Sequence, residues 1–226
     1  MWASRLGMAG IVAFVVGPLL AHFRVVPAMV GFLVFDLGGL LGAVALVVAV
    51  VARLRGAGGA GMGLALGGLI LIAFVMIASP GRKYPRINDI TTDTATPPQF
   101  VKAGALAANH GRDMSYPGAT FTDQQRQGYP DLGPLQLNAA PDEAFKRVVA
   151  AARQMPTWEI TRADPAARAI EGVDTTRVFR FQDDFVIEVR PQDSGSLVQM
   201  RSKSRDGKGD IGANAARITA FFAVLR

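Results

Sequence analysis

The stretch Val25–Ala52, VVPAMVGFLVFDLGGLLGAVALVVAVVA, decides the first half of the fold. Its 28 residues include a single charged side chain, Asp36. A helix needs about 20 mostly apolar residues to cross the hydrocarbon core of a membrane, and backbone groups at that depth must pair inside the helix. This stretch therefore predicts a transmembrane helix.

Two more apolar stretches flank the first one. Leu6–Phe23 and Gly56–Ala78 contain no Lys, Arg, Asp or Glu, and each is long enough to span a membrane. We expect the first to be retained and not cleaved as a signal peptide, because two more spans follow it and no small-residue cleavage pattern leads to a polar start. A transmembrane domain of residues 1–80 is thus predicted. Its spans cover about residues 6–23, 28–52 and 58–79.

Small residues recur at every fourth position of these stretches. On a helix, this spacing forms a smooth stripe that allows close approach of a second helix. Two interpretations stay open: the three helices pack on one another, or the stripes dock a partner membrane protein. The stripes comprise Ala9, Ala13 and Gly17, then Gly38 and Gly42, then Gly59, Gly63 and Gly67.

Asp36 is the intramembrane polar residue of the predicted spans. An unpaired carboxylate at this depth costs about 3 kcal/mol or more, so it usually faces the helix bundle or a cavity. A role in proton or ion movement is the alternative. Because the neighbouring spans offer no second titratable partner, we expect a packed polar contact.

Charge and composition limit the chemistry of the remaining chain. The net charge is +6, and residues 81–226 carry 20 Lys and Arg against 17 Asp and Glu, which is no polybasic surface. Nucleic acid is therefore not expected as a partner. The chain has no Cys and two His, so disulfides and thiolate metal sites are excluded, and neither a metal nor a cofactor is predicted.

The few charges near the spans suggest an orientation. The predicted loop with Arg53 and Arg55 is short, and short loops dominate the positive-inside bias, whereas long domains cross largely regardless of charge. We expect a multi-pass protein of the bacterial cell membrane with an extracytoplasmic soluble domain.

Residues 81–226 predict a soluble α+β domain, an antiparallel sheet meander with helices packed on one face. Residues 84–134 are rich in Gly and Pro and are expected to form mostly loop with short helical turns. A helix is predicted between Pro141 and Pro156, and another over about 211–225. Turns are expected at Gln182-Asp183-Asp184 and Asp193-Ser194-Gly195. The predicted strands are Thr157–Thr161, Ala167–Val173, Arg177–Phe181, Phe185–Arg190 and Leu197–Ser204.

Several motifs resemble the bacterial and plastid family called domain of unknown function 1499, over about residues 84–226. The resemblance implies no catalytic residue, because that family has no assigned activity. An N-terminal membrane segment is similar to what many of its members show. The matching pieces are Pro85–Ile90 with Thr92 and Asp93, Pro97-Pro98 with Phe100, Tyr129–Leu132, Trp158, Phe181–Pro191, Arg201–Arg205, Gly207, Asp210, Gly212–Asn214 and Arg217-Ile218.

The last of these motifs offers the best candidate site. Alternation along a strand places Arg201, Lys203 and Arg205 on one face, and a glycine-bracketed turn then leads into a helix with Asn214 and Arg217 in its first turns. Cations beside a helix N-terminus can bind phosphate or carboxylate, so these five residues are the candidate anion ligands. We expect Asp210 to cap the helix. The structural alternative to an anion site is that the basic residues form an exposed strand face paired with Glu188 and Asp206.

Three hypotheses about function follow. The favoured one is a non-enzymatic, membrane-anchored accessory protein of the cell envelope that binds an anionic ligand or a lipid headgroup. The second is a structural subunit of a larger membrane complex, docked through the glycine-striped helices. The third is a hydrolase or transferase acting on a phosphate-bearing substrate with Asp210 as base, which requires Asp210, Arg201 and Arg217 to converge in a cleft. The expected partners are the lipid bilayer, an anionic lipid or envelope component, and a membrane protein.

Overall fold

A computed structural model describes residues 2–226, which fall into two compact units. One unit contains the described residues up to Arg82 together with Thr176–Arg180. The other contains Lys83–Thr175 and Phe181–Arg226. The second unit holds the sheet and a buried hydrophobic core of its own.

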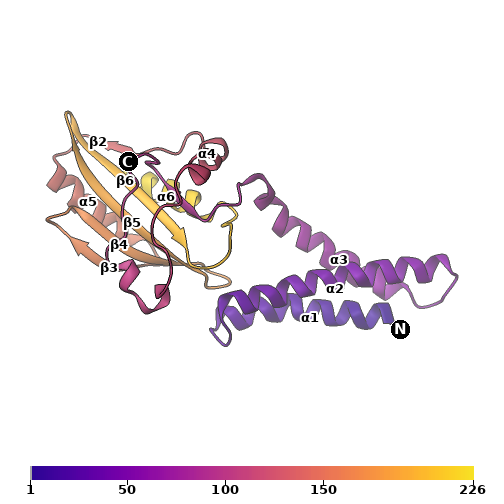
Figure 1. The fold of residues 1–226 in the computed structure, drawn as a ribbon. Coiled ribbons are helices and arrows are strands. Elements are labelled where there is room, and N and C mark those ends of the chain that lie inside the picture. The colour runs from indigo at the N-terminus through magenta and orange to yellow at the C-terminus, as the bar shows by residue number, and fades with distance from the viewer. Residues whose placement is uncertain (1) are drawn as a thin grey trace. The chain divides into compact units, whose positions relative to one another are not determined.

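Three long helices make up most of the first unit: α1 (Trp2–His22), α2 (Ala28–Leu54) and α3 (Gly61–Ala78) (Figure 1). All three are long and apolar enough to cross a membrane, which confirms the predicted number of membrane-length helices. Pro27 directly precedes α2, where a missing backbone donor costs nothing. Gly59 lies before α3 with φ +79°, a backbone conformation that favours glycine.

Most glycines of the predicted stripes lie where these helices touch, whereas Ala9 of the first stripe is exposed. A Cβ atom added at Gly17 would lie 2.5 Å from the backbone oxygen of Gly31, on the neighbouring helix. One added at Gly67 would lie 2.6 Å from the backbone nitrogen of Leu46. The stripes are therefore used inside the chain, between α1 and α2 and between α2 and α3. Gly59, by contrast, has no atom within 4 Å of such a Cβ.

The second unit begins with short helices and strands and continues with the longer strands of a sheet and two helices. Before the sheet proper, the chain passes through a 3₁₀ helix, η1, at Ser79–Lys83. The elements that follow are β1 (Asp89–Thr91), η2 (Ala103–Ala105), η3 (Ala107–Asn109), α4 (Ala119–Gly128), β2 (Leu135–Leu137), α5 (Pro141–Gln154), β3 (Trp158–Asp164), β4 (Ala169–Thr175), β5 (Gln182–Gln192), β6 (Gly195–Ser204) and α6 (Ala213–Leu225).

These strands form one six-stranded antiparallel sheet. Strands β3 to β6 follow one another as a meander, and the strand order is β1-β6-β5-β4-β3. Strand β2 also pairs with β6, near the start of that strand, whereas β1 pairs nearer its end. The α+β fold with an antiparallel meander is thus confirmed.

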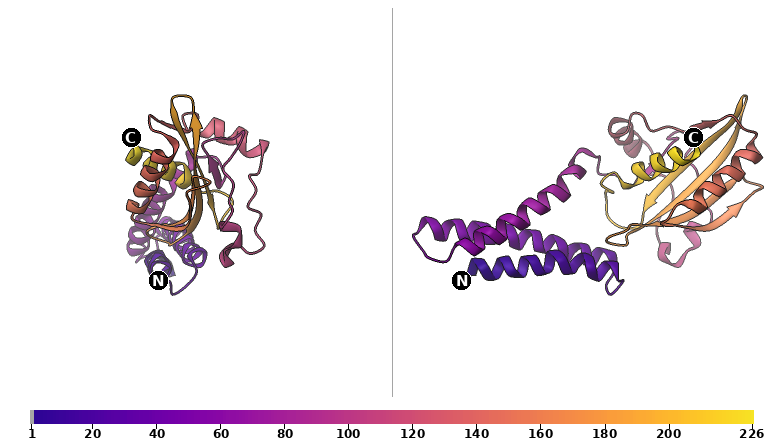
Figure 2. Two further views of the ribbon diagram at one scale, coloured as in Figure 1. Left: turned by 90° about the vertical axis from the view of Figure 1, so that its left-hand side faces the viewer. Right: turned by 180° about the vertical axis from the view of Figure 1, so that it is seen from behind.

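The two faces of the sheet are covered differently. Helices α5 and α6 lie on one face (Figure 2, left), where side chains such as Ile170, Phe185 and Met200 form the hydrophobic core with Val148 and Ile218. Because side chains alternate across a strand, the intervening residues point to the opposite face. We call the first the helix face and the second the polar face.

The polar face is buried beneath the segment 92–118 rather than exposed. Glu171 on β4 is fully buried, and its carboxylate accepts hydrogen bonds from the backbone N–H groups of residues 101–103 at 2.8–3.1 Å. Asn109 donates a hydrogen bond to Asp184 at 2.9 Å. Buried carboxylates thus hold the irregular segment on the sheet, since a buried charge must be hydrogen-bonded to be tolerated.

Two local predictions were wrong. Arg177–Phe181 forms the connection between β4 and β5, and the Phe179 ring packs 5.2 Å from the Phe32 ring within the first unit. The predicted turn Gln182-Asp183-Asp184 is the start of β5, and both aspartates are buried. Acidic residues are typical of turns, but here buried cations pair with them. The turn at Asp193-Ser194 is present as expected.

Asp93 gives the domain a pH dependence that can be measured. Burial acts to raise the pKa of Asp93, but hydrogen bonds from Thr96, Ala95 and Gln199 outweigh burial and hold that pKa below its usual value. A lowered pKa adds stability above about pH 4, the unfolded value, and this contribution is lost as the pH falls through the folded pKa. Asp93→Asn is therefore expected to lower the unfolding temperature at pH 7.

The comparison at acidic pH tests the cause. Below the folded pKa of Asp93 the carboxyl group is protonated and resembles the amide, so the difference in unfolding temperature between the wild type and Asp93→Asn should be smaller at a strongly acidic pH than at pH 7. Thermal unfolding of the full chain in a mild detergent, followed by circular dichroism at both pH values, measures this. A difference that stays constant between the two pH values contradicts the assignment.

Candidate functional site

Arg201 lies on the polar face and is fully buried. Its guanidinium donates two hydrogen bonds to the carboxylate of Asp89, at 2.8 and 2.7 Å, in a bidentate pair. It also donates to the backbone oxygens of Pro98 and Met114, and it lies over the ring of Phe100 at 4.8 Å. Four of the five N–H donors of this side chain are thus directed at protein groups, and its full burial keeps it away from a ligand in solution.

Lys203 and Arg205 complete the basic side of the polar face. Lys203 Nζ lies 2.9 Å from the same Asp89 carboxylate. Arg205 donates to both carboxylate oxygens of Asp184, at 3.0 and 2.6 Å, and to the side-chain oxygen of Gln182 at 2.8 Å. The alternation expected for the strand is therefore real, but its cations face Asp89 and Asp184.

Asn214 and Arg217 project from α6 onto the helix face. Arg217 pairs with Asp174 at 2.6 Å and with Asp183 at 2.5 Å. The Asn214 side-chain oxygen accepts hydrogen bonds from Arg217 and from the hydroxyl of Ser202. This cluster is buried, and the sheet separates it from Arg201 and its neighbours because β6 presents Ser202 and Arg201 on opposite faces.

Asp210 lies just before α6. Its carboxylate accepts hydrogen bonds from the backbone N–H groups of Gly212 and Asn214, each at 2.9 Å. Burial raises the pKa of Asp210, although those two hydrogen bonds act in the opposite direction. A carboxylate that satisfies the open N–H groups of a helix start holds that start in place.

The five candidate ligands consequently do not form one anion site. The sheet divides them into two buried networks, and each of the four cations among them already pairs with a buried carboxylate, Arg201 and Lys203 sharing that of Asp89. Their partners also differ from the Glu188 and Asp206 of the alternative prediction. The convergence of Asp210, Arg201 and Arg217 that the hydrolase or transferase hypothesis requires is not found at these residues.

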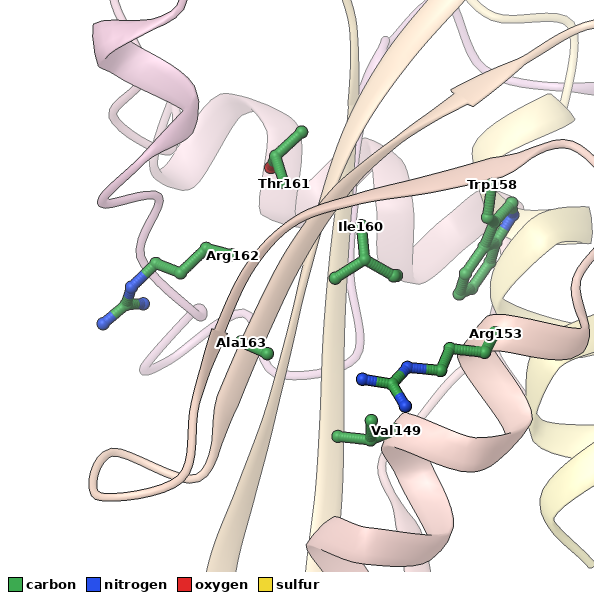
Figure 3. Close-up of a pocket in the computed structure, with 7 residues that line it drawn as sticks. All are labelled: Val149, Arg153, Trp158, Ile160, Thr161, Arg162 and Ala163. Atoms are coloured by element: carbon green, nitrogen blue, oxygen red, sulfur yellow. The ribbon is translucent and has the colours of Figure 1, made fainter.

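A groove between α5 and β3 is a better candidate (Figure 3). It consists of two adjoining cavities of about 480 and about 770 Å³, which share Val149, Arg153 and Ala163 as lining residues. Cavities of about 300–1,000 Å³ are the usual size of small-molecule sites. We call this the α5–β3 groove; its main lining residues are Phe145, Lys146, Val149, Arg153, Trp158 and Ile160.

The sequence of α5 explains how the groove is lined. Residues three and four apart share a helix face, so Lys146, Val149 and Arg153 lie along one side, while Val148 packs into the core. The last strand of the sheet, β3, supplies the other wall. In Figure 3 the side chain of Arg153 extends from α5 toward β3, beside Ile160.

The α5–β3 groove combines an apolar wall with two free cations. Arg153 and Lys146 are exposed, and neither makes a hydrogen bond or an ion pair with any residue of 2–226. Asp142 at the end of the groove is paired with Arg168 at 2.6 Å. Arg162 pairs with Asp164 and Glu171, and in Figure 3 it points away from α5. The groove therefore keeps a positive charge that no protein group neutralises.

Asp36 lies in α2 and is half-buried. Within residues 2–226 it has no hydrogen bond or ion pair. No cluster of three or more metal-ligating His, Asp or Glu side chains occurs among the described residues either.

Comparison with known families now identifies the soluble half. The model of the family described as protein of unknown function (DUF1499) matches residues 89–225, more than half of the chain. The chain belongs to the DUF1499 family. No curated protein matches it. The matched range begins with β1 and ends with α6, so the DUF1499 domain of this chain is the sheet together with both covering helices.

Several charged residues that carry the family resemblance belong to the two buried networks of the DUF1499 domain. Asp89, Arg201, Lys203 and Arg205 hold the segment 92–118 and strand β1 to the sheet, and Arg217 holds α6 to the β4–β5 end. Sequence reasoning missed the α5–β3 groove. The signal was available in α5, where two cations, Lys146 and Arg153, share one helix face with the apolar Val149.

Proposed function

We propose that this chain is a membrane-anchored binding protein whose α5–β3 groove takes an anionic amphiphile, that is, a molecule with a carboxylate or phosphate group and an apolar body. The proposal keeps the non-enzymatic accessory role and the anionic ligand expected from the sequence. It moves the site from the Arg201–Arg217 motif to the groove, because buried carboxylates occupy the cations of that motif.

The free guanidinium of Arg153 over an apolar wall carries the proposal. An arginine can bind a carboxylate or phosphate in a bidentate way, and such charge-assisted hydrogen bonds are among the stronger ones in proteins. Lys146 lies seven residues earlier on the same helix face, about 10 Å away along the axis at 1.5 Å per residue. Phe145, Val149 and Ile160 offer apolar surface between and beside the two cations.

The membrane helices suit such a ligand. Amphiphiles concentrate in bilayers, so a groove anchored to a membrane meets its ligand at high local concentration. We place the domain in the cell envelope of a bacterium, on the extracytoplasmic side, because the short Arg53–Arg55 loop then lies in the cytoplasm. An envelope lipid or lipid precursor with a negative charge is the matching class of ligand.

Energy transfer from Trp158 to a fluorescent anionic fatty acid tests the proposal. The chain has two tryptophans, so Trp2→Phe leaves Trp158, in the wall of the groove, as the sole donor. In nanodiscs of neutral lipid, the affinity for the probe should fall about tenfold or more in Lys146→Ala with Arg153→Ala, because charge-assisted hydrogen bonds contribute roughly 1.5–3 kcal/mol.

Two controls sharpen the measurement. Lys102→Ala removes one exposed cation outside the groove and should leave the affinity unchanged. The uncharged methyl ester of the probe should bind the wild type and the double variant equally. If the acid and its ester bind the wild type with the same affinity, or if the double variant retains full affinity for the acid, the proposed function is wrong.

A further inference from the structure

The loop Asp206–Gly212 presents an apolar side chain in an unusual backbone conformation. Ile211 is 60% exposed, and its φ is +54°. A β-branched residue rarely adopts a positive φ, because its Cβ crowds the backbone. An isoleucine that is both strained and exposed contributes no stability to the fold, and this points to a contact with something outside the domain.

The loop is held firmly in this conformation. Asp210 accepts hydrogen bonds from Gly212 and Asn214 through its carboxylate, and its own backbone N–H donates to the backbone oxygen of Ile87 at 3.2 Å. Asn88 donates to the backbone oxygen of Gly207 at 2.7 Å. These contacts join the loop to residues 87 and 88, so Ile211 is displayed on a rigid support.

The loop contacts a residue that follows α3 closely in the chain. A Cβ atom on Gly212 would lie 2.7 Å from the Tyr84 ring, so the loop and Tyr84 are in direct contact. Tyr84 follows the end of α3 at Ala78 by six residues. Six extended residues span at most about 20 Å, and a 3₁₀ path is shorter, about 12 Å. If α3 crosses a membrane, this short connection limits the distance between Tyr84 and the membrane surface to about 20 Å.

Three unpaired cations belong to the loop and to the segment 83–86 that contacts it. Lys208 is in the loop itself, Arg86 contacts Gly209, and Lys83 Nζ lies 5.0 Å over the Tyr84 ring. Within residues 2–226 none of these three side chains forms an ion pair. The loop also contains two acidic residues, the exposed Asp206 and Asp210, whose carboxylate faces the N–H groups of Gly212 and Asn214, so the three cations outnumber the acids by one. An apolar tip among cations matches the boundary between acyl chains and anionic headgroups.

We infer that the Asp206–Gly212 loop is a second membrane contact, in which Ile211 enters the headgroup region and Lys83, Arg86 and Lys208 bind anionic lipid headgroups. This inference is independent of the α5–β3 groove. It gives the DUF1499 domain a fixed attachment to the bilayer in addition to its covalent link, and that attachment strengthens with the anionic lipid content.

The absence of cysteine makes the test direct. Ile211→Cys carries the only thiol of the chain, and an environment-sensitive fluorophore on it reports membrane contact. In nanodiscs containing anionic lipid, quenchers attached to the acyl chains should reduce its emission at least twofold. The matched control is Val224→Cys, which is 52% exposed near the far end of α6, about 18 Å along the helix from Gly212.

Charge reversal and lipid composition separate membrane contact from simple exposure. Arg86→Glu with Lys208→Glu should abolish the extra quenching at position 211 in anionic nanodiscs and leave the label at position 224 unaffected. Ile211→Gly relieves the positive φ, so it should raise the unfolding temperature, which shows that isoleucine is not retained for stability. If the label at position 211 is no better quenched by acyl-chain quenchers than the label at position 224, or is equally quenched after charge reversal, the inference fails.

Discussion

Arg201→Met is expected to destabilise the DUF1499 domain by about 3–5 kcal/mol, the usual loss when one partner of a buried ion pair is removed. The substitution leaves the fully buried Asp89 with Lys203 as its remaining cation and frees the backbone oxygens of Pro98 and Met114. Chemical unfolding of the full chain in a mild detergent, followed by Trp158 fluorescence in a Trp2→Phe background, measures the loss.

The matched control is Arg153→Met. This substitution also replaces an arginine by methionine, but the arginine is exposed and unpaired, so the expected change stays within about 0.5 kcal/mol. Arg201→Lys should lie between the two, because lysine keeps the charge and loses the bidentate geometry. The segment 92–118 should also become sensitive to protease in Arg201→Met. Equal stability of Arg201→Met and Arg153→Met would show that the Asp89 pair contributes nothing.

The second large effect is expected in the first unit, where the three long helices pack. Gly67→Leu places a side chain where a Cβ atom already lies 2.6 Å from the backbone nitrogen of Leu46 and 2.7 Å from the backbone oxygen of Gly42. Backbone atoms cannot move aside as a flexible side chain does, so α2 and α3 must separate. We expect a loss of about 3 kcal/mol, the upper end for overpacking, seen as a large fall in the unfolding temperature in detergent.

Gly68→Leu is the neighbouring control. A Cβ atom at Gly68 meets nothing within 4 Å, so the same change one residue later should leave the unfolding temperature nearly unchanged. The pair also tests the hypothesis of a partner protein. If Gly67→Leu leaves the unfolding temperature unchanged but removes a co-purifying membrane protein, the stripe serves that partner and not the contact between α2 and α3.

The elements that could be predicted from the sequence are those with strong local periodicity. Long apolar runs gave the three membrane helices, and the alternation of Phe185, Ile187 and Val189 gave β5. Strands β1 and β2 have three residues each, too few for a period to be visible. Asp183 and Asp184 suggested a turn because their partners, Arg217 and Arg205, lie 34 and 21 residues away in the sequence.

The sequence predicted which basic residues share a strand face, but not which side chains they contact. Alternation correctly placed Arg201 and Lys203 on one face of a strand. Nothing local indicates that Asp89 would meet them, because β1 pairs with β6 only in the finished sheet. The sequence does not show which carboxylate a cation will meet, and this is why the anion site was assigned to residues that already pair with carboxylates. Arg153, which is free, lacked any motif to draw attention to it.

The pairing of β1 with β6 also determines how late during synthesis the sheet can form. Asp89 must wait for Arg201, which follows it by 112 residues. At roughly 5–20 residues per second, the ribosome needs about 6–20 s to supply that partner. The three apolar helices have by then already left the ribosome, while Asp89 still lacks its partner in the sheet. A nascent chain that stalls before β6 therefore has its N-terminal helices but not the strand that pairs with both β1 and β5.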